Sequence, residues 1–284
     1  MVDQKLAIIT GASSGLGLES AKALVSQGFK VLMVSRGEEK LLNAANQIRK
    51  ERPEAQISEH VVDVSNLDQV RAFAKSITEP VSILMNNAGL MGPDFQLSID
   101  GIESQMATNH IGHFLLTAEL WGNLNQASGR VVSLSSVVHR RSNLLNLDLK
   151  NLVGAEQSNY NRWQRYADTK LACLLFAREL DIRIRQQGSK VTSVAAHPGW
   201  AITGLQKNFP HALDSFAQDA KTGARSQILA ATDQTLQGGE FIGPKFELWG
   251  EPKRISGSKV SKDLHLSKRL WELTEELIGA KFLP

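Results

Sequence analysis

The chain has 284 residues, of which 42% are hydrophobic and 21% are charged, and a formal net charge of +3. This length can hold one α/β domain with a large core and a ligand pocket. The mild charge, with no basic run interleaved with aromatic residues, argues against a nucleic-acid partner, and a single cysteine, Cys173, excludes an internal disulfide and a cysteine-based metal site.

Strand-like and helix-like segments alternate along the chain. The first residues lead directly into a strand pattern with no signal peptide, and no apolar run approaches 18 residues, so we expect a cytoplasmic protein without a membrane span. Strands are predicted at 5–10, 30–35, 56–62, 81–85, 130–134 and 190–196, with a seventh at 245–249. Helices are predicted at 15–28, 38–51, 66–77, 111–126 and 163–187.

This alternation predicts an α/β fold with a doubly wound parallel sheet and helices on both faces. The strands are rich in Val and Ile with little alternation, which is typical of strands covered on both sides. No linker divides the chain, so we expect one domain over 1–284. Two long stretches, 139–160 and 200–221, follow carboxyl ends of strands, where ligands bind in such sheets, and we interpret them as substrate-covering segments.

A glycine-rich turn joins the first strand to the first helix in Thr10-Gly-Ala-Ser-Ser-Gly-Leu-Gly17. Its glycines allow a tight turn and a close approach of the backbone to a phosphate, and the following helix N-terminus attracts negative charge. Serine hydroxyls add hydrogen-bond donors. The turn predicts a dinucleotide site formed by Gly11, Ser13, Ser14, Gly15, Leu16 and Gly17.

Residues after the next strands add to this site. Arg36 ends the second strand, where an arginine suits the 2′-phosphate of NADP and an acid would suit the ribose of NAD, so the sequence favours NADP(H) over NAD(H). Asp63, before Val64, is suited either to the adenine amino group or to capping the next helix. Asn87, Ala88 and Gly89 follow the fourth strand and tolerate a tight backbone beside a cofactor.

Tyr166 and Lys170 are four residues apart, so on a helix they share one face. A free tyrosine titrates at about pH 10, and an ammonium about 5 Å away favours the phenolate by roughly 3 kcal/mol at an effective dielectric of about 20. The pair therefore predicts a general acid/base that works near neutral pH.

Together these motifs resemble the short-chain dehydrogenase/reductase family. TGASSGLG, NNAG, YADTK and His197-Pro-Gly199 occur in the family's order along nearly the whole chain. Thr108-Asn-His-Ile-Gly-His-Phe114 and the stretch before Tyr166 are similar to the retinol-dehydrogenase-like and protochlorophyllide-reductase-like branch. The resemblance implies a Rossmann-type sheet of about seven strands in the order 3-2-1-4-5-6-7.

The resemblance also implies a catalytic tetrad. Tyr166 passes a proton to or from the substrate oxygen, and Lys170 favours the phenolate and binds the nicotinamide ribose. Ser136 orients the substrate oxygen, with Ser133 and Ser135 as rivals on sequence alone. Asn109 holds a water in a relay from Lys170 to solvent. Pro198, Gly199 and Thr203 match the positions beside the nicotinamide carboxamide.

We therefore expect an enzyme that interconverts an alcohol and a ketone or aldehyde with NADP(H) and a small-molecule substrate. Two alternatives are a C=C reductase of enones with the same cofactor and a non-catalytic NADP-binding regulator. No metal is expected, because His110, His113, His139 and His197 lack partners at ligand spacing. No GxSxG elbow surrounds Ser136, which argues against a hydrolase.

Two further points concern the pocket and the oligomeric state. The faces 111–120 and 171–176 fit either an internal core or a seam between subunits, so a homodimer, a tetramer and a monomer all stay open. An apolar or aromatic substrate is favoured by the apolar residues of the two covering segments: Leu144, Leu145, Leu147, Leu152, Val153, Trp200, Leu205, Phe209 and Phe216.

Overall fold

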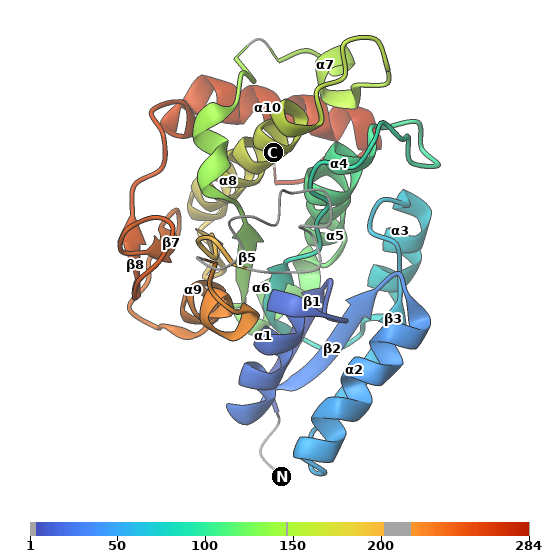
Figure 1. The fold of residues 1–284 in the computed structure, drawn as a ribbon, viewed down its shortest axis with the longest axis vertical. Coiled ribbons are helices and arrows are strands. Elements are labelled where there is room, and N and C mark those ends of the chain that lie inside the picture. Colours follow the sequence, from blue (N-terminus) through green and yellow to red (C-terminus); the bar gives the residue numbers. More distant parts are fainter. Residues whose placement is uncertain (1–3, 146, 202–216, 284) are drawn as a thin grey trace.

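A computed structural model describes residues 4–145, 147–201 and 217–283. Its centre is an eight-stranded sheet with the strand order β3-β2-β1-β4-β5-β6-β7-β8 (Figure 1). Every neighbouring pair is parallel except β7 and β8, which are antiparallel. The strands are β1 (Leu6–Thr10), β2 (Lys30–Ser35), β3 (Ile57–Val61), β4 (Val81–Asn86), β5 (Arg130–Leu134), β6 (Thr192–Ala196), β7 (Phe241–Pro244) and β8 (Pro252–Ile255).

Helices connect the strands. The long ones are α1 (Gly15–Ser26), α2 (Glu38–Glu51), α3 (Leu67–Ser76), α8 (Arg162–Gln186), α9 (Ala220–Thr232) and α10 (Leu264–Ile278). A helical stretch between β4 and β5 is divided into α4 (Ser104–Met106), a π-helical turn η1 (Ala107–Ile111), α5 (Gly112–Glu119) and α6 (Trp121–Ala127). Short helices η2 (Val137–Arg141), α7 (Leu149–Val153) and η5 (Val260–Lys262) complete the set.

The helices cover both faces of the sheet, as the strand composition predicts. On one face α1, α2 and α9 pack their apolar residues against the strands, with Leu24, Leu41 and Ile48 fully or almost fully buried. On the other face α3, α5 and α8 do the same, with Val70, Phe114 and Leu171 fully buried. The doubly wound Rossmann-type fold is therefore confirmed.

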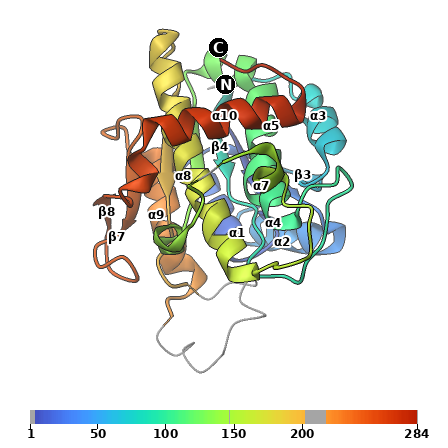
Figure 2. The same ribbon diagram turned by 90° about the horizontal axis from the view of Figure 1, so that it is seen from above.

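The last helix lies against α8 and across α5, as Figure 2 shows. Trp271 of α10 stacks on Phe176 of α8, with ring centroids 5.9 Å apart, and meets Phe114 of α5 edge-on at 4.7 Å. Phe282 packs on the same rings. The sequence left open whether the faces 111–120 and 171–176 belong to an internal core or to a seam between subunits. At these aromatic contacts the structure shows an internal core.

Two sequence predictions need correction. The seventh strand is β7 at Phe241–Pro244 and an eighth strand follows, whereas 245–249 forms the turn between them. Glu247 takes a positive φ of 65° and Gly250 a φ of 107°, and such a backbone turns the chain. The predicted continuous helix at 111–126 starts earlier, at Ser104, and breaks at Leu120, whose φ and ψ of −87° and 5° leave the helical region.

Within the described residues, none of the helices combines the length and the apolar character needed to cross a bilayer.

Candidate active site

The site lies where the strand order reverses. β1 has β2 on one side and β4 on the other, so the chain leaves β1 and β4 in opposite directions, and ligands of open α/β sheets bind at the carboxyl ends of strands at such a reversal. Asn109, Tyr166 and Lys170 lie on helices, whereas other predicted site residues follow within two positions of the carboxyl ends of six strands, β1 to β6: Gly11, Arg36, Asp63, Asn87, Ser136 and Pro198. The fold thus brings to one edge residues that are far apart in the sequence.

The glycine-rich turn lies in close contact with the start of α1. Gly11 has a φ of 67°, and a Cβ atom on Gly17 would lie 2.3 Å from the Gly11 carbonyl oxygen, so α1 can approach the turn only with glycine there. The Ser14 side chain at the N-cap of α1 makes no capping hydrogen bond within the described chain. The first N–H groups of α1 therefore fit an anion, as the sequence predicts.

Thr10 joins this turn to the segment after β4. Its buried hydroxyl accepts hydrogen bonds from the backbone N–H groups of Asn87 and Ala88, both at 2.9 Å. The Asn87 side chain donates to the Thr10 carbonyl at 2.7 Å and accepts from Gln227 of α9 at 3.1 Å. These bonds fix the backbone of Asn87-Ala88-Gly89 beside the glycine-rich turn.

The predicted adenine side includes Arg36, Asp63 and Val64. Arg36 is exposed at the end of β2, next to Ser35, whose hydroxyl lies 2.9 Å from that of Ser13. Asp63 Oδ1 accepts from the backbone N–H and the hydroxyl of Ser65, whereas Asn66 caps α3. Of the two roles open to Asp63, helix capping is therefore taken by another residue.

Tyr166 and Lys170 lie on one face of α8, as their spacing predicts. Lys170 Nζ is 5.6 Å from the centre of the Tyr166 ring and donates to the Leu134 carbonyl at 3.0 Å. Both side chains are buried, with 8% and 6% of their surface exposed. This contact joins the Tyr166 helix to the end of β5, just before the three candidate serines.

The structure separates those serines. Ser135 Oγ donates to the Lys170 carbonyl at 2.7 Å and so supports the helix, and Ser133 is buried within β5. Ser136 is half-buried and begins η2, which packs against α8. It is therefore the serine with accessible surface beside the Tyr166 helix.

Asn109 lies in the π-helical turn η1 and is 2% exposed. Its side chain accepts from the Leu90 N–H at 2.7 Å and donates to Thr169 of α8 at 2.9 Å. Its main-chain carbonyl accepts from Cys173 Sγ at 3.1 Å and from His113 Nδ1 at 3.2 Å. Asn109 thus joins the segment after Gly89 to the helix that carries Tyr166 and Lys170.

The segment after β6 is only partly described. Pro198 and Gly199 lie at the carboxyl end of β6, and Gly199 has a φ of 77° and lies against the Leu248 carbonyl. Thr203, with most of the predicted covering segment 200–221, lies outside the described residues. At its edges Trp200 and Gln218 are joined by a backbone hydrogen bond of 2.8 Å.

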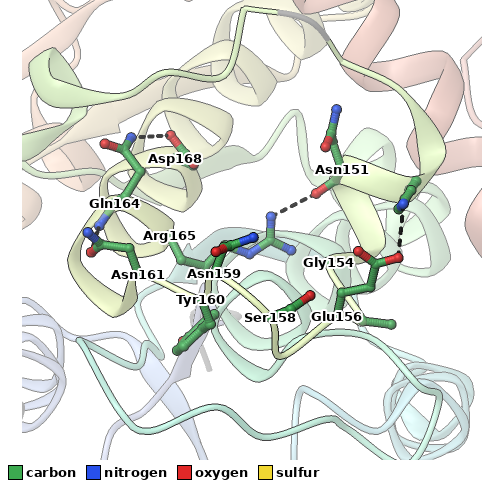
Figure 3. Close-up of a pocket in the computed structure, with 12 residues that line it drawn as sticks. Asn151, Gly154, Glu156, Ser158, Asn159, Tyr160, Asn161, Gln164, Arg165 and Asp168 are labelled. Atoms are coloured by element: carbon green, nitrogen blue, oxygen red, sulfur yellow. Dashed lines mark hydrogen bonds and ion pairs between the residues drawn. The ribbon is translucent and has the colours of Figure 1, made fainter.

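Part of the predicted covering segment 139–160 lines a hollow of about 260 Å³ with the start of α8, and Tyr166 is not among its lining residues (Figure 3). Its polar groups bind one another: Lys150 pairs with Glu156, and Asp168 accepts from Ser142 and Gln164. Three of the apolar residues assigned above to a substrate wall, Leu144, Leu147 and Leu152, are instead buried in the core. Leu152 belongs to α7, which lies against α10.

A buried ion pair joins this segment to α4 and α8. Glu103, fully buried, accepts from Arg165 Nε at 2.8 Å and from the Tyr160 hydroxyl at 2.9 Å. Arg165 also donates to the carbonyls of Asn151 and Leu152. Burial, followed by the nearby Glu103 charge, raises the pKa of Tyr160 to about 12, so its hydroxyl stays protonated as a donor.

Comparisons with known proteins agree with this geometry. The short chain dehydrogenase family model matches residues 5–145. Human retinol dehydrogenase 12 is 32% identical over 290 residues, which cover 98% of this chain and 87% of that protein. The chloroplastic short-chain dehydrogenase TIC 32 B of Brassica napus is 37% identical, covering 96% and 88%. A crystal structure of a Mycobacterium paratuberculosis protein is 34% identical with a TM-score of 0.84, covering 98% and 95%.

The chain therefore belongs to the short-chain dehydrogenase/reductase family of oxidoreductases. Within the family it lies in the retinol-dehydrogenase-like branch, as the motifs around Asn109 and before Tyr166 predict.

Sequence reasoning missed Thr10, His113 and Glu103. Each is a buried polar residue whose partner is distant in the sequence: Thr10 Oγ lies 2.8 Å from His113 Nε2, and Glu103 pairs with Arg165. His113 is the second histidine of TNHIGHF and follows Asn109 by four residues, so the sequence predicts that both lie on the same helix face. No sequence signal ties it to Thr10.

Proposed function

We propose that this protein is an NADP(H)-dependent oxidoreductase that interconverts an alcohol and a ketone or aldehyde. One observation carries the proposal: Lys170 Nζ lies 5.6 Å from the Tyr166 ring, at the carboxyl edge of the sheet where the strand order reverses. A phenol with a cation beside it is an arrangement suited to proton transfer to and from a substrate oxygen.

The surrounding residues fit a nicotinamide dinucleotide. The uncapped N-terminus of α1 and the close contact of Gly17 with Gly11 leave room for a pyrophosphate. Asp63 suits the adenine amino group, because one of its carboxylate oxygens has no partner within the described residues. Arg36 suits a 2′-phosphate, which favours NADPH over NADH. The dinucleotide supplies the hydride when bound.

Each catalytic residue then has a defined task. Tyr166 transfers the proton to or from the substrate oxygen, and Ser136 orients that oxygen by a hydrogen bond. Lys170 contributes positive charge and a donor for the ribose. Asn109 positions the helix segments around Lys170 through its bonds to Leu90 and Thr169. Its main-chain carbonyl accepts from Cys173 and His113. The proposed relay water would donate to this same carbonyl oxygen.

An apolar or aromatic substrate is favoured by Trp163. Its ring lies against Gly92 and keeps 38% of its surface exposed, three residues before Tyr166 and on the same helix face. Arg140 of η2 and Glu247 of the β7–β8 turn form an ion pair, so together they add little net charge between these elements. We further propose that 1–284 acts as one domain, because the core that contains Leu6 also contains Leu283.

The test is oxidation of NADPH, followed by its absorbance, with a panel of aldehydes, ketones, quinones and enones. We expect turnover with aldehydes or ketones and its near loss in Tyr166→Phe, while NADPH binding is retained. Turnover of enones alone would favour the C=C reductase, and NADPH binding without any turnover would favour the regulator. Undiminished activity in Tyr166→Phe would refute the assignment of Tyr166.

A further inference from the structure

His113 lies between the dinucleotide-binding turn and the catalytic residues. It occupies the first turn of α5, and 3% of its surface is exposed. Its Nε2 is 2.8 Å from the hydroxyl of Thr10 at the end of β1. Its Nδ1 is 3.2 Å from the main-chain carbonyl oxygen of Asn109, in the π-helical turn just before α5.

The hydrogen-bond partners fix where the protons lie. A carbonyl oxygen only accepts, so Nδ1 of His113 carries the proton and donates to Asn109. The Thr10 oxygen already accepts from the N–H groups of Asn87 and Ala88, which leaves its own proton for an acceptor. Nε2 of His113, 2.8 Å away, is that acceptor, whereas the Met85 carbonyl is more distant at 3.3 Å.

The ring is neutral under ordinary conditions. Burial lowers the pKa of His113, the hydrogen bond to the Asn109 carbonyl raises it, and the positive charge of Lys170 lowers it, which together bring it to about 4. A neutral ring with its proton on Nδ1 is the one form that satisfies both partners. The imidazolium would place an N–H against the Thr10 hydroxyl and remove its acceptor.

We propose that His113 is a positioning residue that couples the dinucleotide-binding turn to Asn109. The chain of donors runs from the N–H groups of Asn87 and Ala88 to Thr10, from Thr10 to His113, and from His113 to the Asn109 carbonyl. This chain of hydrogen bonds links the position of the backbone that contacts the dinucleotide to the position of the π-helical turn that packs against Lys170. This inference rests on the proposed function, because it takes these two regions as the cofactor and catalytic sites.

Three substitutions of His113 remove its hydrogen bonds to Thr10 and Asn109 separately or together. In His113→Asn, the amide can donate to Asn109 from the position of Nδ1 but cannot reach Thr10. In His113→Gln, the amide reaches Thr10 from the position of Nε2 but no donor remains for Asn109. His113→Phe keeps the ring shape and loses both bonds. A lost hydrogen bond of this kind corresponds to a change of about three- to tenfold in binding or rate.

The experiment measures the Kd of NADPH by fluorescence, kcat with the best carbonyl substrate, and the melting temperature. We expect His113→Asn to weaken NADPH binding with little change in kcat, His113→Gln to lower kcat with little change in Kd, and His113→Phe to do both. A purely structural role would lower only the melting temperature. Equal Kd and kcat in all folded variants would overturn the coupling.

A matched control is the neighbouring buried histidine. His110 bonds Thr274 of α10 at 3.1 Å and makes no contact with Thr10, so His110→Phe should alter stability and leave Kd and kcat unchanged. If the His113 variants fail to fold, the wild-type apoprotein still decides the question. In ¹⁵N-histidine spectra, the signal of His113 should be that of a neutral ring with its proton on Nδ1, and a proton on Nε2 would overturn the proposal.

The proposed function and the coupling fail differently. Wild type that binds no nicotinamide nucleotide overturns both. Wild type that binds NADPH without turnover overturns the enzymatic function, and the coupling is then decided by Kd, which should rise in His113→Asn and His113→Phe but not in His113→Gln.

Discussion

A Cβ atom on Gly112 would lie 1.7 Å from the carbonyl oxygen of Val64, so α5 touches the backbone that follows β3. We expect Gly112→Ala to force these segments apart and to lower the free energy of unfolding by about 1–3 kcal/mol. Because Val64 flanks the proposed adenine site, the Kd of NADPH should rise as well. Urea denaturation and fluorescence titration measure the two effects.

The control for this substitution is Gly122→Ala. Gly122 is exposed on α6, and no atom lies within 4 Å of the position its Cβ would take. Alanine should stabilise this helix by roughly 0.5–1 kcal/mol. Equal effects of the two substitutions would contradict the close contact between α5 and Val64.

The buried pair of Glu103 and Arg165 should show strong coupling. The Glu103 side chain is fully buried and that of Arg165 is 11% exposed, so removing one partner leaves a charge with little access to water. We expect Glu103→Gln or Arg165→Met alone to cost about 3–5 kcal/mol of stability. The double variant should cost clearly less than the sum. A double-mutant cycle by chemical denaturation tests this, and additive losses would count against it.

The pieces of the fold that follow from local pattern were predicted well from the sequence. β2 and β5 have the predicted bounds, because short Val-rich runs between turn residues determine them. The segment 245–249 was misplaced because Phe246 and Trp249 give it the composition of a strand, although Glu247 takes a positive φ. The amino-acid composition of a short segment does not reveal such a turn.

The candidate site also has parts that local motifs predict and parts that they do not. Motifs at strand ends predicted which residues meet at one edge, because parallel strands bring their carboxyl ends together. The bond between Thr10 and His113 joins residues 103 positions apart, and Leu144 and Leu152 are buried in the same core as α10 residues such as Trp271. Both depend on how the helices pack, which periodicity along one segment does not determine.

Acid should destabilise the protein through its buried histidines. Burial lowers the pKa of His110 and of His197 to about 3, so the unfolded chain, with histidine near 6.5, binds more protons than the folded one. The free energy of unfolding therefore falls as the pH drops from about 6.5 toward 4, by about 1.4 kcal/mol per pH unit for each histidine.

The contribution of one histidine can be isolated with His110→Phe. Thr274 keeps the Leu270 carbonyl as a partner at 2.7 Å, so the substitution leaves no new buried donor. Urea denaturation between pH 5 and pH 7 should give a slope smaller by about one proton than that of wild type. An unchanged slope would mean that His110 titrates normally in the folded protein.

The cofactor preference should depend on Arg36. It is exposed at the end of β2, and within the described residues no carboxylate forms an ion pair with it, so its charge is available to a 2′-phosphate. Arg36→Asp removes this donor and places a negative charge there, so the Kd of NADPH should rise about 10- to 100-fold while that of NADH falls or stays constant. Lys50→Asp makes the same charge change at the far end of α2 and should leave the ratio of the two Kd values unchanged. Fluorescence titrations with both nucleotides measure this ratio, and an equal ratio in wild type and Arg36→Asp would exclude Arg36 as the residue that selects NADPH.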